Sequence, residues 1–400
     1  MLLLTSLSIF IWTLVIRIST HLEPIADEVC VLGEWRENSF LPPHHSSPRV
    51  FGSLFTWLLA PIWRLEYTLG FLVIIMIAAL LIFKIFSLSV IQLSGENPSF
   101  KSKITFTALA TPWILFTLPP NKSALFDSVF WFGGSWHLIG ALVFSYTVLQ
   151  ILSQERNGNF IYLWILIASF WSETTACLIL IVMFLNLGKD KNYRKALVLP
   201  IAGVALNIFA NLNSERINDV QESALRNNLD ILKGSLKMLI EYGLRSVFIA
   251  IILTVIFLPF SSEYRNVPTK RIIWMMLLTT SGMVSIYLVG YPTWRSSSII
   301  GLTCFTLSFL FFGRISKNAS SILVSILVTL ILGLNTVSNL NSIETVSAER
   351  SNWWSSVVTS NETLSPFKFT GEKPEFLQAD YGSSEWIDRC FQDFKAKEVK

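Results

Sequence analysis

The chain has 400 residues, of which 52% are hydrophobic and only 14% are charged, and it contains 30 Phe and 14 Trp. A soluble globular domain has about a quarter of its residues charged, so this composition excludes a water-soluble protein and predicts a multi-span membrane protein. The net charge of +4 is small and spread between apolar runs, which excludes nucleic acid as a partner because phosphate binding needs a concentrated basic face.

The first apolar run has no basic segment before it and no small-residue cleavage site after it. We therefore interpret it as a retained membrane helix and not as a signal peptide. Further apolar windows follow, several of them shorter than the roughly 20 residues that a straight span needs. The predicted spans are 1–20, 68–93, 104–119, 128–152, 159–171, 174–187, 197–209, 236–260, 272–291, 296–313 and 319–338.

The stretch 159–187 could be one tilted helix or two short helices that meet at "WSETT". The basic cluster "GKDKNYRK" follows it, and a single span would place this cluster on the side opposite to the other basic segments. Because Lys and Arg are enriched in cytoplasmic loops, the sequence favours two short helices with Glu173 at their outer turn. Non-helical backbone at that depth must line a protein-enclosed or watery cavity.

With eleven alternating spans, one set of connecting segments is densely basic. The opposite set has eight basic residues in about twice the length, so the dense set is predicted to be cytoplasmic. The N-terminus is then inside. The residues of the dense set are Lys101, Lys103, Arg156, Lys189, Lys191, Arg194, Lys195, Arg265, Lys270, Arg271, Arg314 and Lys317.

The predicted fold is an all-α polytopic transmembrane bundle of about eleven spans over residues 1–338, with outer loops at 21–66 and 210–235. From position 339 the sequence turns polar, and residues 339–400 are expected to form a small extracytoplasmic C-terminal tail. Cys30 and Cys390 would share the outer compartment and could pair, although the cysteine count does not decide this.

This topology places several unusual polar and aromatic residues on the outer face. Charged groups at a membrane boundary are costly unless they pair or carry out a function, so these residues are candidates for a polar cavity. Each also has a structural interpretation, such as a solvated loop acid, a snorkelling arginine or an aromatic belt. The candidates are Asp27, Glu28, Trp136, His137, Glu173, Asn213, Arg216 and Arg295.

Three local stretches add a resemblance to a known family. "SFWSETTACLIL" resembles a Ser-x-Glu-x-Thr turn, "NIFANLNSERIN" resembles an Ala-Pro-Gly-Asn-x-x-Arg loop, and "YPTWRSSSIIGLTCF" is similar to a Tyr-Phe-Pro-x-Arg-x motif. Together with an acidic pair after the first helix, this layout resembles the C-type (GT-C) integral membrane glycosyltransferase superfamily, in particular bacterial O-antigen-modifying glucosyltransferases. Where that family has Pro-Gly-Asn, this chain has Asn211-Leu212-Asn213, so only Asn213 and Arg216 carry over from that loop.

The resemblance implies a GT-C-like enzyme of the bacterial inner membrane whose active site faces the extracytoplasmic side. It would move a sugar, with inversion, from a polyprenyl-phosphate carrier to a glycan, lipid or protein acceptor. Asp27, and next Glu28, would act as the base, while Arg216 and Arg295 would hold the lipid phosphate. Glu173, Asn213, His137 and Trp136 would bind substrate.

The cofactor and the function class leave alternatives open. Outer carboxylates could hold Mg²⁺ or Mn²⁺ together with substrate phosphates, but nothing in the sequence requires a metal. A transporter or flippase also places charges near spans, although repeated halves are absent from this sequence. An O-antigen polymerase or ligase is also polytopic, but it is expected to have one large, late outer loop.

Overall fold

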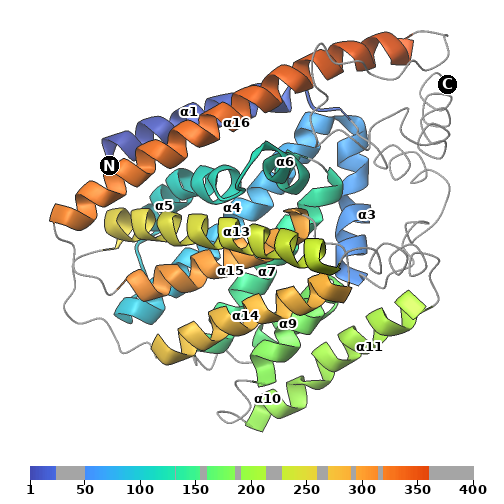
Figure 1. The fold of residues 1–400 in the computed structure, drawn as a ribbon, viewed down its shortest axis with the longest axis vertical. Coiled ribbons are helices and arrows are strands. Elements are labelled where there is room, and N and C mark those ends of the chain that lie inside the picture. The colour runs from blue at the N-terminus through green and yellow to red at the C-terminus, as the bar shows by residue number, and fades with distance from the viewer. Residues whose placement is uncertain are drawn as a thin grey trace.

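The computed structural model is a bundle of helices (Figure 1). It describes residues 1–23, 50–130, 132–153, 160–184, 191–212, 228–258, 269–289, 294–313 and 319–359. Within these ranges the chain forms helices and no strands, which confirms the predicted all-α class.

The helices have these bounds in chain order. They are α1 (Leu2–Ser19), α3 (Val50–Leu65), α4 (Tyr67–Ser94), α5 (Phe100–Pro112), the π-helical turn η2 (Trp113–Thr117), α6 (Lys122–Leu125), the π-helical turn η3 (Phe126–Phe130), α7 (Phe132–Ser153), α8 (Phe160–Ser169), α9 (Glu173–Phe184), α10 (Lys191–Ala196), α11 (Val198–Leu212), α13 (Asn228–Phe257), α14 (Thr269–Val289), α15 (Trp294–Phe312) and α16 (Ala319–Thr359).

Five helices among the described residues are long and apolar enough to cross a membrane, and four shorter apolar helices accompany them. This is compatible with an integral membrane protein, while the number of about eleven spans stays a prediction. The five long segments are Leu2–Ser19, Tyr67–Ser94, Gly134–Ser153, Leu232–Phe257 and Ile322–Ser356, and the shorter ones are Phe160–Ser169, Glu173–Phe184, Ile272–Met283 and Ser297–Phe312.

The helices pack in three groups. In Figure 1, α1 and α16 run side by side along one edge of the bundle, and they contact each other directly. The central group contains α4, α7, α13 and α15, with α15 packed against both α7 and α13. At the opposite edge α9 packs against α11 and α14.

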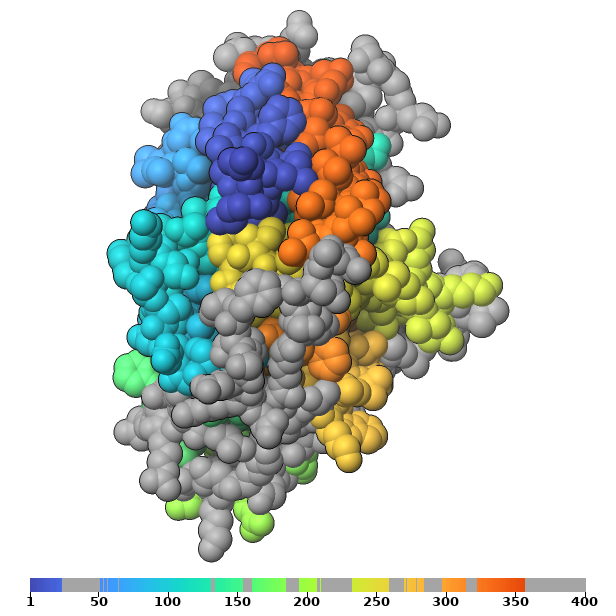
Figure 2. Space-filling view, turned by 90° about the vertical axis from the view of Figure 1, so that its left-hand side faces the viewer, coloured from blue at the N-terminus to red at the C-terminus, as the bar shows by residue number. Residues whose placement is uncertain are grey.

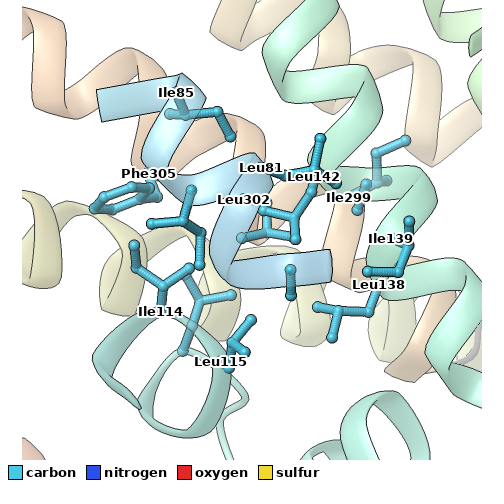
Figure 3. Close-up of a cluster of buried hydrophobic side chains, with 14 of the residues drawn as sticks. Leu81, Ile85, Ile114, Leu115, Leu138, Ile139, Leu142, Ile299, Leu302 and Phe305 are labelled. Carbon is cyan, nitrogen blue, oxygen red and sulfur yellow. The ribbon is translucent and has the colours of Figure 1, made fainter. Parts of the chain in front are cut away.

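The core lies where the central helices meet the π-helical turn η2 (Figure 3). Apolar side chains from these elements are buried and interdigitate at the helix interfaces, as expected for interiors packed to near-crystalline density. The labelled residues are Leu81, Ile85, Ile114, Leu115, Leu138, Ile139, Leu142, Ile299, Leu302 and Phe305.

A glycine allows the close approach of α13 and α15. A Cβ on Gly301 would lie 2.6 Å from the ring of Tyr242 on α13, so no larger residue fits without a shift. Close to it, Ser246 Oγ donates a 2.8 Å hydrogen bond to the Gly301 carbonyl. Small residues and hydroxyl bonds of this kind are typical of membrane helix contacts.

The stretch between α5 and α7 is irregular, and one arginine holds part of it. η2 ends the helical run at Thr117, so its last carbonyls lack helical partners. Arg245 Nη1 on α13 donates to the carbonyls of Thr117 and Pro119, each at 3.1 Å. Since irregular backbone at membrane depth must be satisfied from within the protein, Arg245 stabilises this break.

The break inside 159–187 is where the sequence predicts it. α8 ends at Ser169 and α9 begins at Glu173. The chain therefore forms two short helices here, with Glu173 in the first turn of the second.

Three predicted boundaries differ from the structure. The expected loop 21–66 contains the 16-residue helix α3, and α13 begins at Asn228 inside the expected loop 210–235. The polar tail expected from position 339 is helical up to Thr359, because α16 continues through that position without interruption. α3 is apolar but only 16 residues long, with Pro61 inside it, whereas the added parts of α13 and α16 contain many polar residues.

Candidate functional site at the exit end of the bundle

We call the end of the bundle at which α1 ends, α4 begins and α8 ends the exit end, on the right in Figure 1. The last carbonyls of α1 are satisfied there by neighbouring hydroxyls. Thr20 Oγ1 donates to the Arg17 carbonyl at 2.8 Å, and Thr68 Oγ1 on α4 donates to the Ser19 carbonyl at 2.7 Å. These bonds fix the place where the chain leaves α1.

The extension of α16 beyond position 339 is fastened to this exit by an ion pair. Arg17 Nη2 lies 2.7 Å from Glu344 Oε1. Arg17 is in the last turn of α1, where a cation also interacts favourably with the helix dipole. Because Arg17 is mostly exposed, the pair contributes little to stability; it joins the last turn of α1 to the part of α16 that lies beyond position 339.

A second set of contacts joins the same two elements just beyond α1. Arg350 Nη1 donates to the Glu23 carbonyl at 3.1 Å, and Ser351 Oγ donates to Glu23 Oε1 at 3.3 Å. Arg350 is only 3% exposed, and its guanidinium lies 5.9 and 5.8 Å from the rings of Trp353 and Trp354. We call Glu23, Glu66, Arg350 and Ser351 the exit cluster.

The exit cluster holds a carboxyl with a shifted pKa. Burial raises the pKa of Glu23 above its ordinary value of 4.5, while the charge of Arg350 and the hydrogen bond from Ser351 act to lower it, and the nearby Glu66 adds to the rise. A raised pKa brings a carboxyl closer to the range in which it exchanges protons near neutral pH.

The break between α8 and α9 forms a second polar site. Thr175 N–H donates to Ser172 Oγ at 3.2 Å, and Ser172 N–H donates to Thr175 Oγ1 at 3.0 Å. This reciprocal pair is a capping box, and it explains why "SETT" begins a helix. Glu173 is in the first turn, where a carboxylate is stabilised by the positive end of the helix dipole.

Aromatic side chains from α7 lie against this break. Trp171 Nε1 donates to the Trp136 carbonyl at 2.8 Å, and the rings of Trp136 and His137 are 3.5 Å apart. The indole of Trp171 also lies against Gly140, where a Cβ would clash with it. We call Trp136, His137, Trp171, Ser172 and Glu173 the break cluster.

Helix α3 connects the two clusters. Its beginning contacts the break, since Phe51 N–H donates to the Phe170 carbonyl at 3.0 Å and a Cβ on Gly52 would lie 2.8 Å from the Trp171 carbonyl. Its end at Leu65 directly precedes Glu66. Leu65 is thirteen positions after Gly52, which corresponds to about 20 Å along a helix. α3 therefore extends across the exit end (Figure 1).

The structure places three of the predicted site residues in the region of the break, where Trp171 links α7 to the beginning of α9, and it does not describe the side chains of the others. Trp136, His137 and Glu173 belong to the break cluster. Arg295 is the second residue of α15, but the position of its side chain lies outside the description. The remaining predictions fall outside the described residues: Asp27, Glu28, Asn213 and Arg216. Cys30 and Cys390 lie there too, whereas Cys177 and Cys304 are free thiols.

Sequence reasoning missed Arg350 and the partnership that it makes with Glu23. Arg350 lies in the segment predicted to be a polar tail, and Glu23 precedes the predicted acidic pair, so neither is among the predicted site residues. The signal available in the sequence was the pairing of Arg350 with two tryptophans in "ERSNWW", a combination that suits cation–π contacts.

Chemically, the exit end offers acids, an arginine, an imidazole and indole rings. Within the described ranges, no three His, Cys, Asp or Glu side chains converge to hold a metal ion. A search of the chain against protein-family models, curated proteins and solved structures finds no match.

Proposed function

We propose that this protein is a membrane glycosyltransferase that moves a sugar from a polyprenyl-phosphate carrier to a glycan, lipid or protein acceptor. The observation that supports it is the gathering of the exit cluster and the break cluster at one end of an apolar bundle. The exit cluster adjoins the beginning of the acidic loop, because Glu23 lies four positions before Asp27. An enzyme for a lipid-linked sugar needs polar chemistry at such a membrane boundary.

The reaction assigns a role to the carboxylates. The acceptor hydroxyl oxygen attacks the anomeric carbon as the bond from that carbon to the phosphate oxygen breaks, and the electron pair leaves on the phosphate. The hydroxyl proton passes to Asp27, and Glu28 is the second candidate for this base. Attack from the face opposite the phosphate inverts the anomeric centre, and acid–base assistance of this kind contributes about 10²–10⁴-fold in rate.

The break cluster suits the sugar. Indole faces such as that of Trp136 provide stacking surfaces for apolar faces of a ring, and His137 and Glu173 provide hydrogen-bonding groups for hydroxyls. Asn213 is proposed to bind substrate as well. Arg216 and Arg295 are proposed to neutralise the carrier phosphate as it gains charge, because the planar guanidinium binds phosphate in a bidentate manner.

The site is proposed to face the extracytoplasmic side of a bacterial inner membrane, within about eleven spans. The basic segments, among them the one that contains Lys101, belong to the opposite, cytoplasmic side. Mg²⁺ or Mn²⁺ could assist by binding carboxylates and substrate phosphate together.

The test is a turnover assay with purified full-length protein in liposomes. Undecaprenyl phosphate carrying glucose, galactose, mannose or N-acetylglucosamine is supplied with an extract of envelope glycolipids and polysaccharides, and released undecaprenyl phosphate is measured with and without Mg²⁺. We expect release with at least one donor, and Asp27→Asn should lower its rate by about 10²–10⁴-fold.

Glu96→Gln is the matched control, because this exposed acid follows the far end of α4. Its rate should equal that of the wild type. If folded protein releases no carrier from any of the four donors, or if Asp27→Asn and Glu28→Gln both keep the full rate, the transferase proposal is wrong.

A further inference from the structure

A polar stripe runs along the first half of α13. Its members recur at every fourth residue, so they share one face of the helix. Lys233 and Lys237 are exposed, and Glu241 and Arg245 are half-buried. Three cations and one carboxylate give the stripe a net charge of +2, which is unusual within the first half of a candidate membrane-spanning segment, Leu232–Phe257.

An apolar stripe runs beside it, one position earlier in each turn. Its four side chains are between 39% and 57% exposed, and large apolar groups exposed on a spanning helix face lipid chains. Cationic groups beside a lipid-facing stripe match an amphipathic ligand that has one anionic end. The apolar stripe consists of Leu236, Ile240, Leu244 and Phe248.

The polar stripe ends at the contact between α13 and α16. Arg245 Nη2 donates to Asn335 Oδ1 on α16 at 2.8 Å, in addition to its two bonds to the carbonyls after η2. A guanidinium has five N–H groups, and the bonds to described residues number three. These three bonds hold the Arg245 guanidinium in place, and its other N–H groups can donate hydrogen bonds to a ligand.

The depth of this junction suits a lipid headgroup. Asn335 is sixteen residues after the start of α16, or about 24 Å along the helix, against a hydrocarbon core of roughly 30 Å. Lys237 precedes Arg245 by eight residues, which is about 12 Å closer to the exit end. With the start of α16 taken as the inner boundary of the hydrocarbon core, Arg245 lies about 6 Å below the outer boundary and Lys237 at the level of the headgroups. Figure 2 shows α13, in yellow-green, emerging beside the orange α16.

We infer that this face of α13, beside Asn335 of α16, binds the phosphate monoester of a polyprenyl-phosphate lipid, with its chain along the apolar stripe. A phosphate monoester carries about −1.5 to −2 charges at pH 7, which complements the net +2 of the stripe, whereas a phospholipid diester carries only one. The choice of lipid rests on the proposed function, and the site would receive the carrier after the sugar has left.

Glu241 is the informative residue within the stripe. It is four residues from both Lys237 and Arg245, where it can pair with either cation, and its charge repels a phosphate. Replacing it with glutamine should strengthen binding of an anionic ligand, while a stripe that serves only to hold the helices together gives no such gain.

The test measures lipid binding directly, by native mass spectrometry of the full-length protein from phosphatidylcholine nanodiscs. The titrants are undecaprenyl phosphate, undecaprenol and phosphatidylglycerol. Undecaprenyl phosphate should bind about tenfold or more tightly than undecaprenol, because charge-assisted hydrogen bonds to phosphate are worth more than that factor, and tighter than phosphatidylglycerol. Raising the salt concentration should weaken binding.

Variants assign the binding to the stripe. Lys237→Gln should weaken undecaprenyl phosphate binding about fivefold, the effect of one cation near the membrane surface, and Glu241→Gln should strengthen it. Arg245→Lys tests the guanidinium while keeping the charge. The matched control is Lys195→Gln, an exposed lysine on α10, which should change nothing.

Equal binding of undecaprenol or phosphatidylglycerol, or unchanged binding in Lys237→Gln and Glu241→Gln, would overturn this site. The outcome is separable from that of the transferase proposal. Selective binding that depends on the stripe, without any turnover, would support the lipid site and refute the transferase proposal. Turnover without stripe-dependent binding would support the transferase proposal and refute the lipid site.

Discussion

Glu23 and Arg350 are 327 positions apart in the chain and meet at the exit of α1. Their partnership is the finding that sequence alone could least provide, because a single sequence contains no information about which distant residues touch. In the sequence, Glu23 is one acid of a predicted loop and Arg350 is one cation of a predicted polar tail, so neither is distinguished. Burial turns them into a coupled pair.

The raised pKa of Glu23 gives stability a definite pH dependence. The folded state binds the proton more tightly than the unfolded state, so the stabilising contribution is fully present below about pH 4.5 and is lost as pH rises through the folded pKa. Glu23→Gln should remove this loss. Thermal melting at pH 4.5, 6 and 8 should therefore show a smaller decline for Glu23→Gln than for the wild type.

Arg350→Gln should act in the opposite direction. It removes the cation that favours ionised Glu23, so the pKa of Glu23 rises further and melting temperatures between pH 6 and 8 decline more steeply. Lys195→Gln provides the comparison for a lost exposed cation. A decline equal to that of the wild type in both Glu23→Gln and Arg350→Gln would show that the exit cluster does not couple protonation to folding.

At the scale of elements, the two short helices α8 and α9 were predictable and α3 was not. Charge on either side of 159–187 required an even number of crossings, and the capping residues of "SETT" are visible in the sequence. α3 is instead only 16 residues long and contains Gly52 and Pro61, which disfavour a helix interior, so a short helix is hidden inside a long loop. Its position across the exit end follows from contacts, not from composition.

The close packing of α3 against the break between α8 and α9 can be tested by adding one methyl group at Gly52. A Cβ on Gly52 would lie 2.8 Å from the Trp171 carbonyl, so Gly52→Ala must displace α3 or the break, and we expect it to lower transfer activity severalfold with the protein still folded. Gly243→Ala is the control, since a Cβ there meets nothing within 4 Å and should raise helix stability by about 0.5–1 kcal/mol. Equal activity in the two variants would contradict the packing described for α3.

Arg245 supports the irregular stretch after η2. Arg245→Met leaves the carbonyls of Thr117 and Pro119 without these donors, and unsatisfied buried polar groups cost about 1–3 kcal/mol. We expect a lower melting temperature for Arg245→Met and a smaller loss for Arg245→Lys. An unchanged melting temperature for Arg245→Met would show that water or lipid satisfies these carbonyls instead.

At the scale of the whole molecule, hydropathy and charge sufficed for the class and for the approximate place of most helices. They could not reveal that α16 continues to Thr359, because its later half is polar on several faces and is stabilised by docking onto α1. Nor could they reveal that Arg245, inside an apolar run, satisfies a helix break in another part of the chain.

The topology predicts which side of the membrane each end of the bundle faces. In a variant without native cysteines, Thr20→Cys at the exit end should react with a membrane-impermeant maleimide from outside intact cells, and Lys101→Cys should react only after permeabilisation. Both positions are exposed. The reverse pattern would place the exit end, and with it the proposed site, on the cytoplasmic side. The cysteines to be replaced are Cys30, Cys177, Cys304 and Cys390.

A cryo-electron microscopy structure of the full-length protein with undecaprenyl phosphate would show whether the bundle binds a lipid phosphate and where. We expect lipid density along α13, with the phosphate beside Lys237 and Arg245. Lipid phosphate bound only at the opposite end of the bundle, or a continuous polar path through the bundle with no lipid on it, would contradict a lipid-phosphate transferase and favour a transporter.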